Sequence, residues 1–320
     1  MAPPLTAGPV ATTIRSLMID QVAGEAIGAM TRAGLRPVLL KGASFASWLY
    51  DDGQARSYSD VDLLVAPDQF DAAAGVLASL GFAPRSAGVA EGEQADHADN
   101  WDRPGSPSID LHNTLSAKVG VSSRQCWDVV SAHTQPTRVG GSATEVLLPS
   151  VLAVHVVLHA EVGRTKTLDD LARALARLDR TQWEAALEIA RTLHAVDAFG
   201  VGLRLLPEGK ELAQALELPT ELSVELYLQA SSTAVLARPF ADVARACGWR
   251  AKAALVAREL VPTPSFLRVW FPPARRGGPW LVAGYVYRLV WVPSHAPRGL
   301  RSWWRARQAV AAGVTPVGRP

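Results

Sequence analysis

The chain has 320 residues, 48% hydrophobic and 19% charged, with a net charge of +2, which supplies enough apolar material for one large or two modest globular cores. Its two cysteines, Cys126 and Cys247, lie far apart and outside any CxxC spacing, which argues against a disulfide framework and a zinc ribbon. No apolar run approaches the ~20 residues of a membrane-spanning helix, and residues 1–16 lack a signal-peptide pattern, so we expect a cytoplasmic protein.

The charges are distributed unevenly along the chain. Nine of the 32 basic residues, and none of the 30 acidic residues, follow Glu259. The preceding part therefore has a net charge of −7. This asymmetry predicts a basic, aromatic C-terminal extension attached to an acidic body.

Helical and strand patterns alternate in the first part of the chain. Apolar residues that recur every three or four positions predict helices, and short apolar or alternating runs predict strands. The predicted order is a helix over 12–33, a short strand that runs into a glycine turn over 37–44, a helix over 45–52, a strand over 60–65, a helix over 67–81 and a strand over 107–115. Strands mixed with helices indicate an α+β domain with a small mixed sheet over residues 1–147.

The pattern changes after TQPTRVGGSATEV (134–146), which is predicted as a turn-rich segment. Residues 148–260 place alanine, leucine and arginine at helical spacing, including ELSVELYLQAS (221–231), and predict an all-helical domain. The prolines and glycines of 262–279 predict breaks that open the C-terminal extension, residues 261–320.

The stretch RSYSDVDLLV (56–65) places two carboxylates two residues apart in an apolar strand. Because side chains alternate along a strand, Asp60 and Asp62 are predicted to project from the same face. Two like charges at that spacing repel, so they need arginine partners, an exposed sheet end or a cation such as Mg²⁺. Asp110, in the predicted strand over 107–115, would complete a site of three carboxylates, with His112 on the same face.

The segment KGAS (41–44) joins the first predicted strand to the following helix. Gly42 ends the strand and Ser44 opens the helix, a geometry in which free backbone N–H groups can hold a phosphate. An ordinary tight turn is the alternative, because glycine turns between strands and helices are common.

Together these motifs carry a family resemblance. VLLKGASFASWLYDDGQARSYSDVDLLV (38–65) resembles the nucleotidyltransferase superfamily related to DNA polymerase beta, whose members carry a Gly-Ser or Gly-x-Ser turn followed by Asp-x-Asp or Asp-x-Glu on the next strand. With the downstream IDLH, HVVLH and LDDLA, the chain is most similar to a bacterial nucleotidyltransferase group, some of whose members are encoded beside lasso-peptide or exopolysaccharide genes. The chain departs from the pattern in its Gly-Ala-Ser turn and its longer gap before Asp60.

The resemblance implies a Mg²⁺-dependent (or Mn²⁺-dependent) enzyme that moves a nucleoside monophosphate from an NTP, with ATP as the first candidate, to an unidentified hydroxyl or phosphate acceptor with release of pyrophosphate. Asp60, Asp62 and Asp110 would bind the metal ions, and Asp110 would act as, or orient, the base. Gly42 and Ser44 would hold the β and γ phosphates.

Three further residues flank this predicted site. Lys41 and Arg56 would neutralise developing charge, or they are an ordinary solvated lysine and loop arginine. His112 would contact the substrate or orient Asp110, or it is an incidental strand histidine.

His155 and His159 sit four residues apart on a helix, a spacing that suits zinc, while the lining of an acceptor pocket is the alternative.

The function has two alternatives at this level. The enzyme could be a tailoring enzyme that acts on a ribosomal, lasso-type peptide, or the chain could be a catalytically silent scaffold that binds a nucleotide. The helical domain would select the acceptor in each enzymatic version.

The C-terminal extension mixes tryptophan and tyrosine with arginine over residues 279–308. This composition favours docking on the acidic body or peripheral contact with a membrane surface. It is also compatible with nucleic acid, but the acidic body argues against a long duplex footprint, so nucleic acid is not the expected partner.

Overall fold

The computed structural model describes residues 9–50, 56–85, 98–160, 164–219, 224, 227, 228 and 236–313. Its contacts divide the chain into two compact units. The first comprises Met1–Arg85, Ala95–Val156 and Ala172–Ala195, and the second comprises Ser86–Gln94, Val157–Leu171 and Val196–Pro320. The predicted boundaries after residues 147 and 260 stay a prediction.

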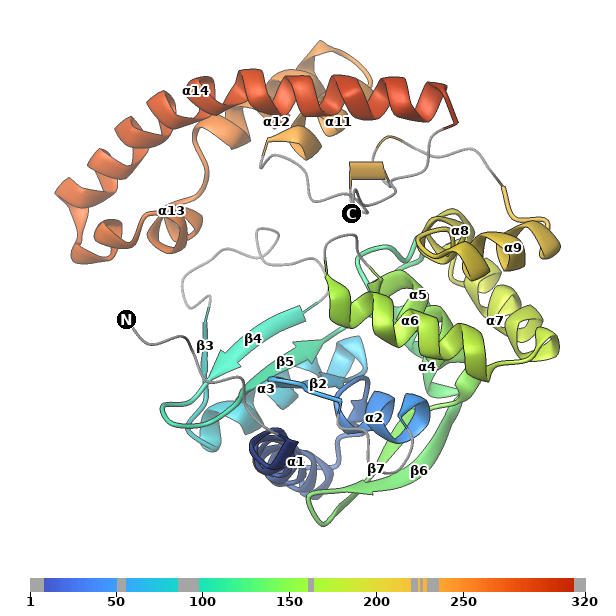
Figure 1. The fold of residues 1–320 in the computed structure, drawn as a ribbon. Coiled ribbons are helices and arrows are strands. Elements are labelled where there is room, and N and C mark those ends of the chain that lie inside the picture. Colours follow the sequence, from blue (N-terminus) through green and yellow to red (C-terminus); the bar gives the residue numbers. More distant parts are fainter. Residues whose placement is uncertain are drawn as a thin grey trace. The chain divides into compact units, whose positions relative to one another are not determined.

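The first unit contains a mixed sheet, to which the described residues contribute seven strands in the order β3-β4-β5-β2-β1-β7-β6 (Figure 1). The central strand β2 pairs in parallel with β5 and antiparallel with β1. The strands are β1 (Val38–Leu39), β2 (Asp60–Leu64), β3 (Ala83–Pro84), β4 (Ala98–Asp102), β5 (Ser108–His112), β6 (Thr134–Val139) and β7 (Ser142–Leu147).

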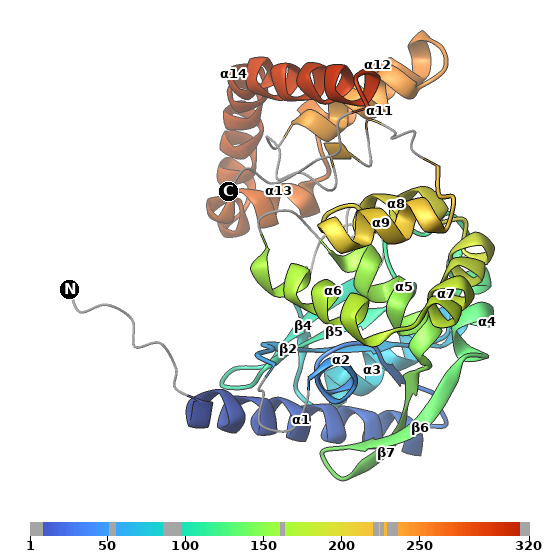
Figure 2. The ribbon, with the colours of Figure 1, turned by 45° about the vertical axis from the view of Figure 1, so that its right-hand side comes forward.

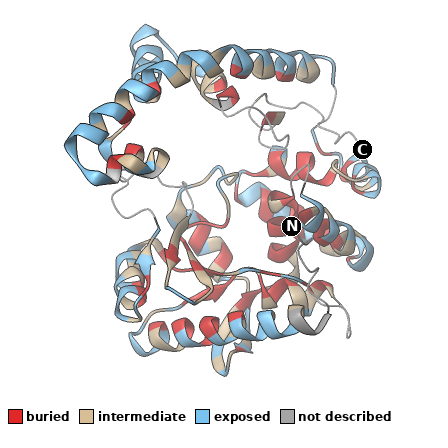
Figure 3. Ribbon diagram, turned by 60° about the vertical axis from the view of Figure 1, so that its left-hand side comes forward, coloured by how far each residue is buried: buried red, intermediate tan, exposed pale blue. Residues whose placement is uncertain are grey.

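The first unit also contains helices, some of which pack against this sheet. They include α1 (Pro9–Arg32), α2 (Ala43–Leu49), the 3₁₀ turn η1 (Pro67–Gln69), α3 (Phe70–Ser79), α4 (Ser123–Ser131) and α7 (Arg180–Thr192). The helices α1 and α3 contact each other, and α1 also contacts β2 and β7, so these two helices cover one sheet face. Val61, Leu63, Ile109 and Leu111 belong to the core cluster that also contains residues of α1 and α3, and Figure 3 shows the buried residues along these elements.

The predicted α+β class is confirmed, with a mixed sheet and a helical C-terminal region. The predicted helices over 12–33 and 67–81 correspond to α1 and to η1 with α3. The helix predicted over 45–52 begins earlier, at Ala43, and its last two residues, Asp51 and Asp52, lie outside the described residues. The helix predicted over 221–231 also lies mostly outside them.

The turn-rich prediction for 134–146 was wrong, because this segment forms the hairpin of β6 and β7. Only its centre is a turn, where Gly140 and Gly141 both have positive φ, 52° and 83°. Two successive left-handed residues make the kind of turn that joins antiparallel strands without disturbing their twist. The turn residues therefore mark two positions, while the flanking Thr, Val and Arg pair as strands.

The remaining described helices lie wholly or partly in the second unit. Both α5 (Pro149–His159) and α6 (Thr165–Arg177) contain residues of both units. The others are α8 (Val196–Leu203), α9 (Pro207–Ala215), α11 (Ala237–Arg245), α12 (Trp249–Leu260), α13 (Pro264–Trp270), the 3₁₀ turn η2 (Pro272–Arg276) and α14 (Gly278–Ala311).

The long helix α14 occupies most of the predicted C-terminal extension, and the short helical segments α13 and η2 lie where breaks were predicted. Pro264 and Pro272 stand in the first turns of α13 and η2, where a missing N–H group costs nothing, so they start helical segments as well as end others. Pro293 and Pro297 lie inside α14, and the helix is visibly bent (Figure 2). A proline removes one helical hydrogen bond and forces such a bend.

Candidate active site

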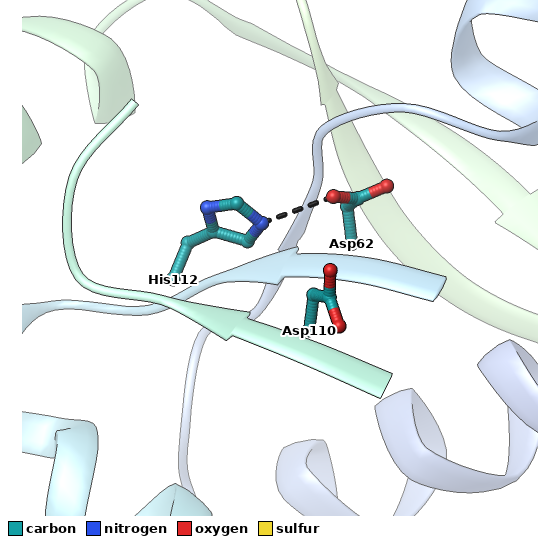
Figure 4. A group of neighbouring side chains, drawn as sticks. All are labelled: Asp62, Asp110 and His112. Atoms are coloured by element: carbon teal, nitrogen blue, oxygen red, sulfur yellow. Dashed lines mark hydrogen bonds and ion pairs between the residues drawn. The ribbon is translucent and has the colours of Figure 1, made fainter. Parts of the chain in front are cut away.

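The strands β2 and β5 bring the predicted acids together. Their parallel register places Asp62 directly beside Asp110 (Figure 4). Because Val61 and Leu63 belong to the core, Asp60 and Asp62 lie on the opposite sheet face, as the alternation predicted. His112 lies two residues beyond Asp110 and therefore shares this face.

Asp62 is a buried carboxylate with two partners. The Nζ atom of Lys41 lies 2.7 Å from its Oδ1 atom, and the Nε2 atom of His112 lies 3.0 Å from the same oxygen. Burial by itself raises the pKa of Asp62, but the Lys41 ammonium and the hydrogen bond with His112 outweigh burial and hold this pKa well below its usual range. Asp62 is therefore ionised at neutral pH.

Asp110 has the opposite environment. Burial raises the pKa of its carboxyl, and the negative charge of Asp62 raises it further. The side-chain amide of Asn100, on the neighbouring strand β4, donates a hydrogen bond to Oδ1 of Asp110 and partly offsets this rise. A second negative charge on this face is thus unfavourable without a cation.

Among the described residues, Asp62, Asp110 and His112 form the cluster that could hold a metal ion. One ligand atom from each lies within 4.8 Å of the other two. Asp60 shares the sheet face but is not one of these three groups. His112, which the sequence assigned to the substrate or to Asp110, makes its hydrogen bond with Asp62.

The turn between β1 and α2 carries the predicted phosphate-binding residues. Gly42 has φ 64° and ψ −118°, the conformation of the first central residue of a type II′ turn, which strongly favours glycine. A Cβ atom at this position would lie 3.4 Å from the Tyr58 ring. Ser44 is buried, and its Oγ atom has no hydrogen-bond partner within the described part of the chain.

Arg56 lies buried beside α2. Its guanidinium carbon lies 5.0 Å from the centre of the Phe45 ring, a cation–π geometry. The alternative interpretation of Arg56 as a solvated loop arginine is therefore wrong. Tyr58 packs in the core and donates a hydrogen bond of 2.7 Å to Asp20.

His155 is also buried against Phe45, with the two rings edge to face at 5.4 Å. Within the described ranges, no group of three possible ligand residues includes His155 or His159. The zinc alternative therefore gains no support from a third ligand.

Two residues near the acids were not predicted from the sequence. Asn100 lies opposite Asp110 in the β4–β5 pairing. Arg85 makes a two-point ion pair with Asp102, which raises the pKa of Arg85, and the charges of Asp110 and Asp60 add to this rise. The only sequence signal for Asn100 is the alternation in ADNWD (98–102), which is too short and too polar to predict a strand.

With this geometry established, comparison with known proteins decides the family. Residues 5–208 match the family described as "Uncharacterised nucleotidyltransferase". The chain belongs to this family. The match covers more than half of the chain and confirms the predicted superfamily and enzyme class, a nucleotidyltransferase.

Solved structures resemble the nucleotidyltransferase more distantly. A solution structure of the antibiotic-resistance factor ANT(2'')-Ia has a TM-score of 0.38 and 13% sequence identity, over 57% of this chain and 95% of that chain. The crystal structure of an antigenic nucleotidyltransferase-like protein from Paracoccidioides brasiliensis has a TM-score of 0.39 and 14% identity, over 62% and 93%. No curated protein sequence matches the chain.

Proposed function

We propose that the enzyme transfers a nucleoside monophosphate from an NTP, with ATP as the preferred donor, to a hydroxyl or phosphate acceptor, and releases pyrophosphate. The observation that carries this proposal is the placement of Asp62 beside Asp110 on neighbouring parallel strands. Membership of the nucleotidyltransferase family supports nucleotidyl transfer in general.

The residues of the site fit Mg²⁺ or Mn²⁺. Two carboxylates and an imidazole converge within 4.8 Å, and burial together with the charge of Asp62 raises the pKa of Asp110, so a further cation would stabilise its ionised form. Oxygen ligands suit Mg²⁺, and the imidazole also suits Mn²⁺. Asp62 and Asp110 would hold the ion, with His112 beside them and Asp60, on the same sheet face, as a further carboxylate. The ion would neutralise charge on the triphosphate and the departing pyrophosphate.

Asp110 is the proposed base. An ionised carboxylate can accept the proton of a hydroxyl group, and Asp110 shares the sheet face of Asp62. It would take the proton of the acceptor hydroxyl, whose oxygen forms a bond to the α-phosphorus while the bond to pyrophosphate breaks. Asn100, which donates to Oδ1 of Asp110, would fix the orientation of this carboxylate.

The turn residues are proposed to bind the phosphates. Lys41 brings a positive charge to Asp62, and Gly42 shapes the backbone that follows. A buried hydroxyl group without a hydrogen-bond partner costs about 1–3 kcal/mol, so a hydrogen bond from Ser44 to a phosphate oxygen would remove this cost. Arg56, buried beside α2, would supply a second positive charge.

The proposal is tested by measuring pyrophosphate release for each NTP with hydroxyl, phosphate and peptide acceptors, before and after removal of divalent cations. We expect release to stop with a chelator and to return with added Mg²⁺ or Mn²⁺. Asp62→Asn and Asp110→Asn should each lower turnover by roughly a thousandfold or more.

Asp99→Asn is the matched control. Asp99 lies on β4 beside Asn100, and side chains alternate along a strand, so it projects from the other face. Its variant should keep wild-type turnover. Near-normal turnover of folded Asp110→Asn would contradict the assignment of the base, and nucleotide binding without any release would instead support the silent scaffold.

A further inference from the structure

The outer face of α14 carries an exposed apolar stripe. Eight large hydrophobic side chains on this helix are more than two-fifths exposed, and six of them, including Val290 at 66% and Val282 at 63%, make up the stripe; Trp280 and Tyr287 lie outside it. With 3.6 residues per turn, the four stripe residues before the bend at Pro293 and Pro297 share one side of the helix, and the two after the bend share one side of its second half. The outer stripe consists of Val282, Val286, Leu289, Val290, Leu300 and Trp304.

The opposite face of α14 is occupied by the rest of its own unit. Gly284, Arg288, Gly299 and Ala306 are its buried residues. A Cβ atom on Gly284 would lie 3.0 Å from the Leu267 side chain, and one on Gly299 would lie 2.7 Å from the Leu236 side chain. The helix is therefore held from its inner face, and the outer stripe is not needed for that packing (Figures 1 and 3).

Positive charge accompanies the outer stripe. Exposed arginines occur along the second half of α14, at Arg298, Arg301, Arg305 and Arg307. No acidic residue follows Glu259, so nothing in this segment of the sequence neutralises them. Exposed valine and leucine beside arginine and tryptophan are typical of helices that lie in the interface of a membrane.

We propose that the outer stripe of α14 docks on the surface of an anionic lipid bilayer. The aliphatic side chains would enter the boundary between headgroups and acyl chains, and the arginines would contact lipid phosphates. Among the described residues, no helix is long and apolar enough to cross a membrane. The contact is thus peripheral and lies along one helix face.

Charge and chemistry favour lipid over other occupants. Two copies of a face that carries only positive charges repel each other, which disfavours self-association through α14. Single-stranded nucleic acid binds through stacking on aromatic rings, whereas five of the eight exposed large hydrophobic side chains of α14 are aliphatic. An anionic bilayer offers both the negative charge and the apolar layer that this face requires.

Vesicle flotation of the full chain tests the proposal. Vesicles of phosphatidylcholine alone are compared with vesicles of equal parts phosphatidylcholine and phosphatidylglycerol. We expect binding to the anionic vesicles only, weakened by salt. The double variant Val286→Asp/Val290→Asp should lower the bound fraction about tenfold or more, because it places carboxylates in the apolar layer.

The matched control is Val256→Asp, an exposed valine on α12 outside the stripe. It should bind vesicles as the wild type does, and circular dichroism should show the same helix content in both variants. Absence of wild-type binding to anionic vesicles, or equal binding by the double variant, overturns the proposal. The proposal is also overturned if the wild type does not bind vesicles but forms a dimer through the stripe, or binds single-stranded nucleic acid. Asp62→Asn should float normally, which separates this test from that of the proposed function.

Discussion

Asp62 and Asp110 are neighbours with opposite tendencies to ionise. Lys41 and His112 hold the pKa of Asp62 low against the effect of burial, whereas burial and the charge of Asp62 raise the pKa of Asp110. Pairs of carboxylates whose environments separate their pKa values are suited to separate roles. In the proposed reaction, Asp62 stays ionised while Asp110 accepts a proton.

Lys41→Met tests the origin of this asymmetry. The side chains of Lys41 and Asp62 are 15% and 4% exposed, so removal of the ammonium leaves a buried charge without its main partner. We expect the free energy of unfolding at neutral pH to fall by about 3 kcal/mol. The lowered pKa of Asp62 gives stability that is present above the unfolded pKa and is lost as the pH falls through the folded pKa.

The loss of unfolding free energy caused by Lys41→Met should therefore become smaller on acidification, because a protonated Asp62 has no charge for Lys41 to neutralise. Denaturant unfolding at several pH values measures this loss. The double variant Lys41→Met/Asp62→Asn should recover part of the loss at neutral pH. Lys210→Met, at an exposed position of α9, is the control and should match the wild type. A loss independent of pH would show that the ion pair is not its cause.

At the scale of an element, the turn before α2 depends on one backbone conformation. Gly42→Ala places a Cβ atom on a residue with φ 64° and ψ −118° and against the Tyr58 ring. We expect a loss of about 1–3 kcal/mol in unfolding free energy, with a lower kcat/KM because Lys41 and Ser44 adjoin this turn.

Gly75→Ala in α3 is the matched substitution. Gly75 is exposed in a helix, and a Cβ atom there meets nothing within 4 Å. The free energy of unfolding of this variant should rise by about 0.5–1 kcal/mol, and its activity should not change. Thermal unfolding of both variants provides the comparison, and equal effects of the two substitutions would rule out a special role for the turn.

The sequence predicted those elements whose residues repeat a clear pattern. Val61 and Leu63 alternate with Asp60 and Asp62, so β2 and its polar face were both predictable. Strand β4 was not predictable, because ADNWD contains a single buried residue, Trp101, and its place in the sheet depends on pairing with the neighbouring strands β3 and β5. The hairpin of β6 and β7 was missed because its strands are half exposed and its glycines dominate the pattern.

At the scale of the whole molecule, the site depends on residues that are distant in sequence. The motif pattern identified Asp62 and Asp110, but their direct register follows from the parallel pairing of β2 with β5. Asn100 could not be predicted, since its role arises only where β4 pairs with β5. Likewise the composition predicted a basic extension, but not that arginine would be buried within it.

Arg288 is that buried arginine, and it holds α14 in the second unit. Its Nε atom donates a 2.7 Å hydrogen bond to the carbonyl of Glu259, and its Nη2 atom lies 3.1 Å from Oε2 of the same residue. Its guanidinium carbon also lies 4.8 Å from the centre of the Trp270 ring. Replacing a buried, paired charge by an apolar side chain is costly when its partner is left behind.

We expect Arg288→Met to destabilise the second unit by about 2 kcal/mol, because Met restores volume but donates no hydrogen bond. The contacts of the chain cluster in two compact units, so the effect should stay within the unit that contains α14. Hydrogen exchange followed by mass spectrometry should show faster exchange in α12, α13 and α14, with unchanged protection of β2 and β5. Arg305→Met, at an exposed position of the same helix, should change the exchange rates of neither the three helices nor the two strands. Equal acceleration of exchange in β2 and β5 would show instead that the two units unfold as one.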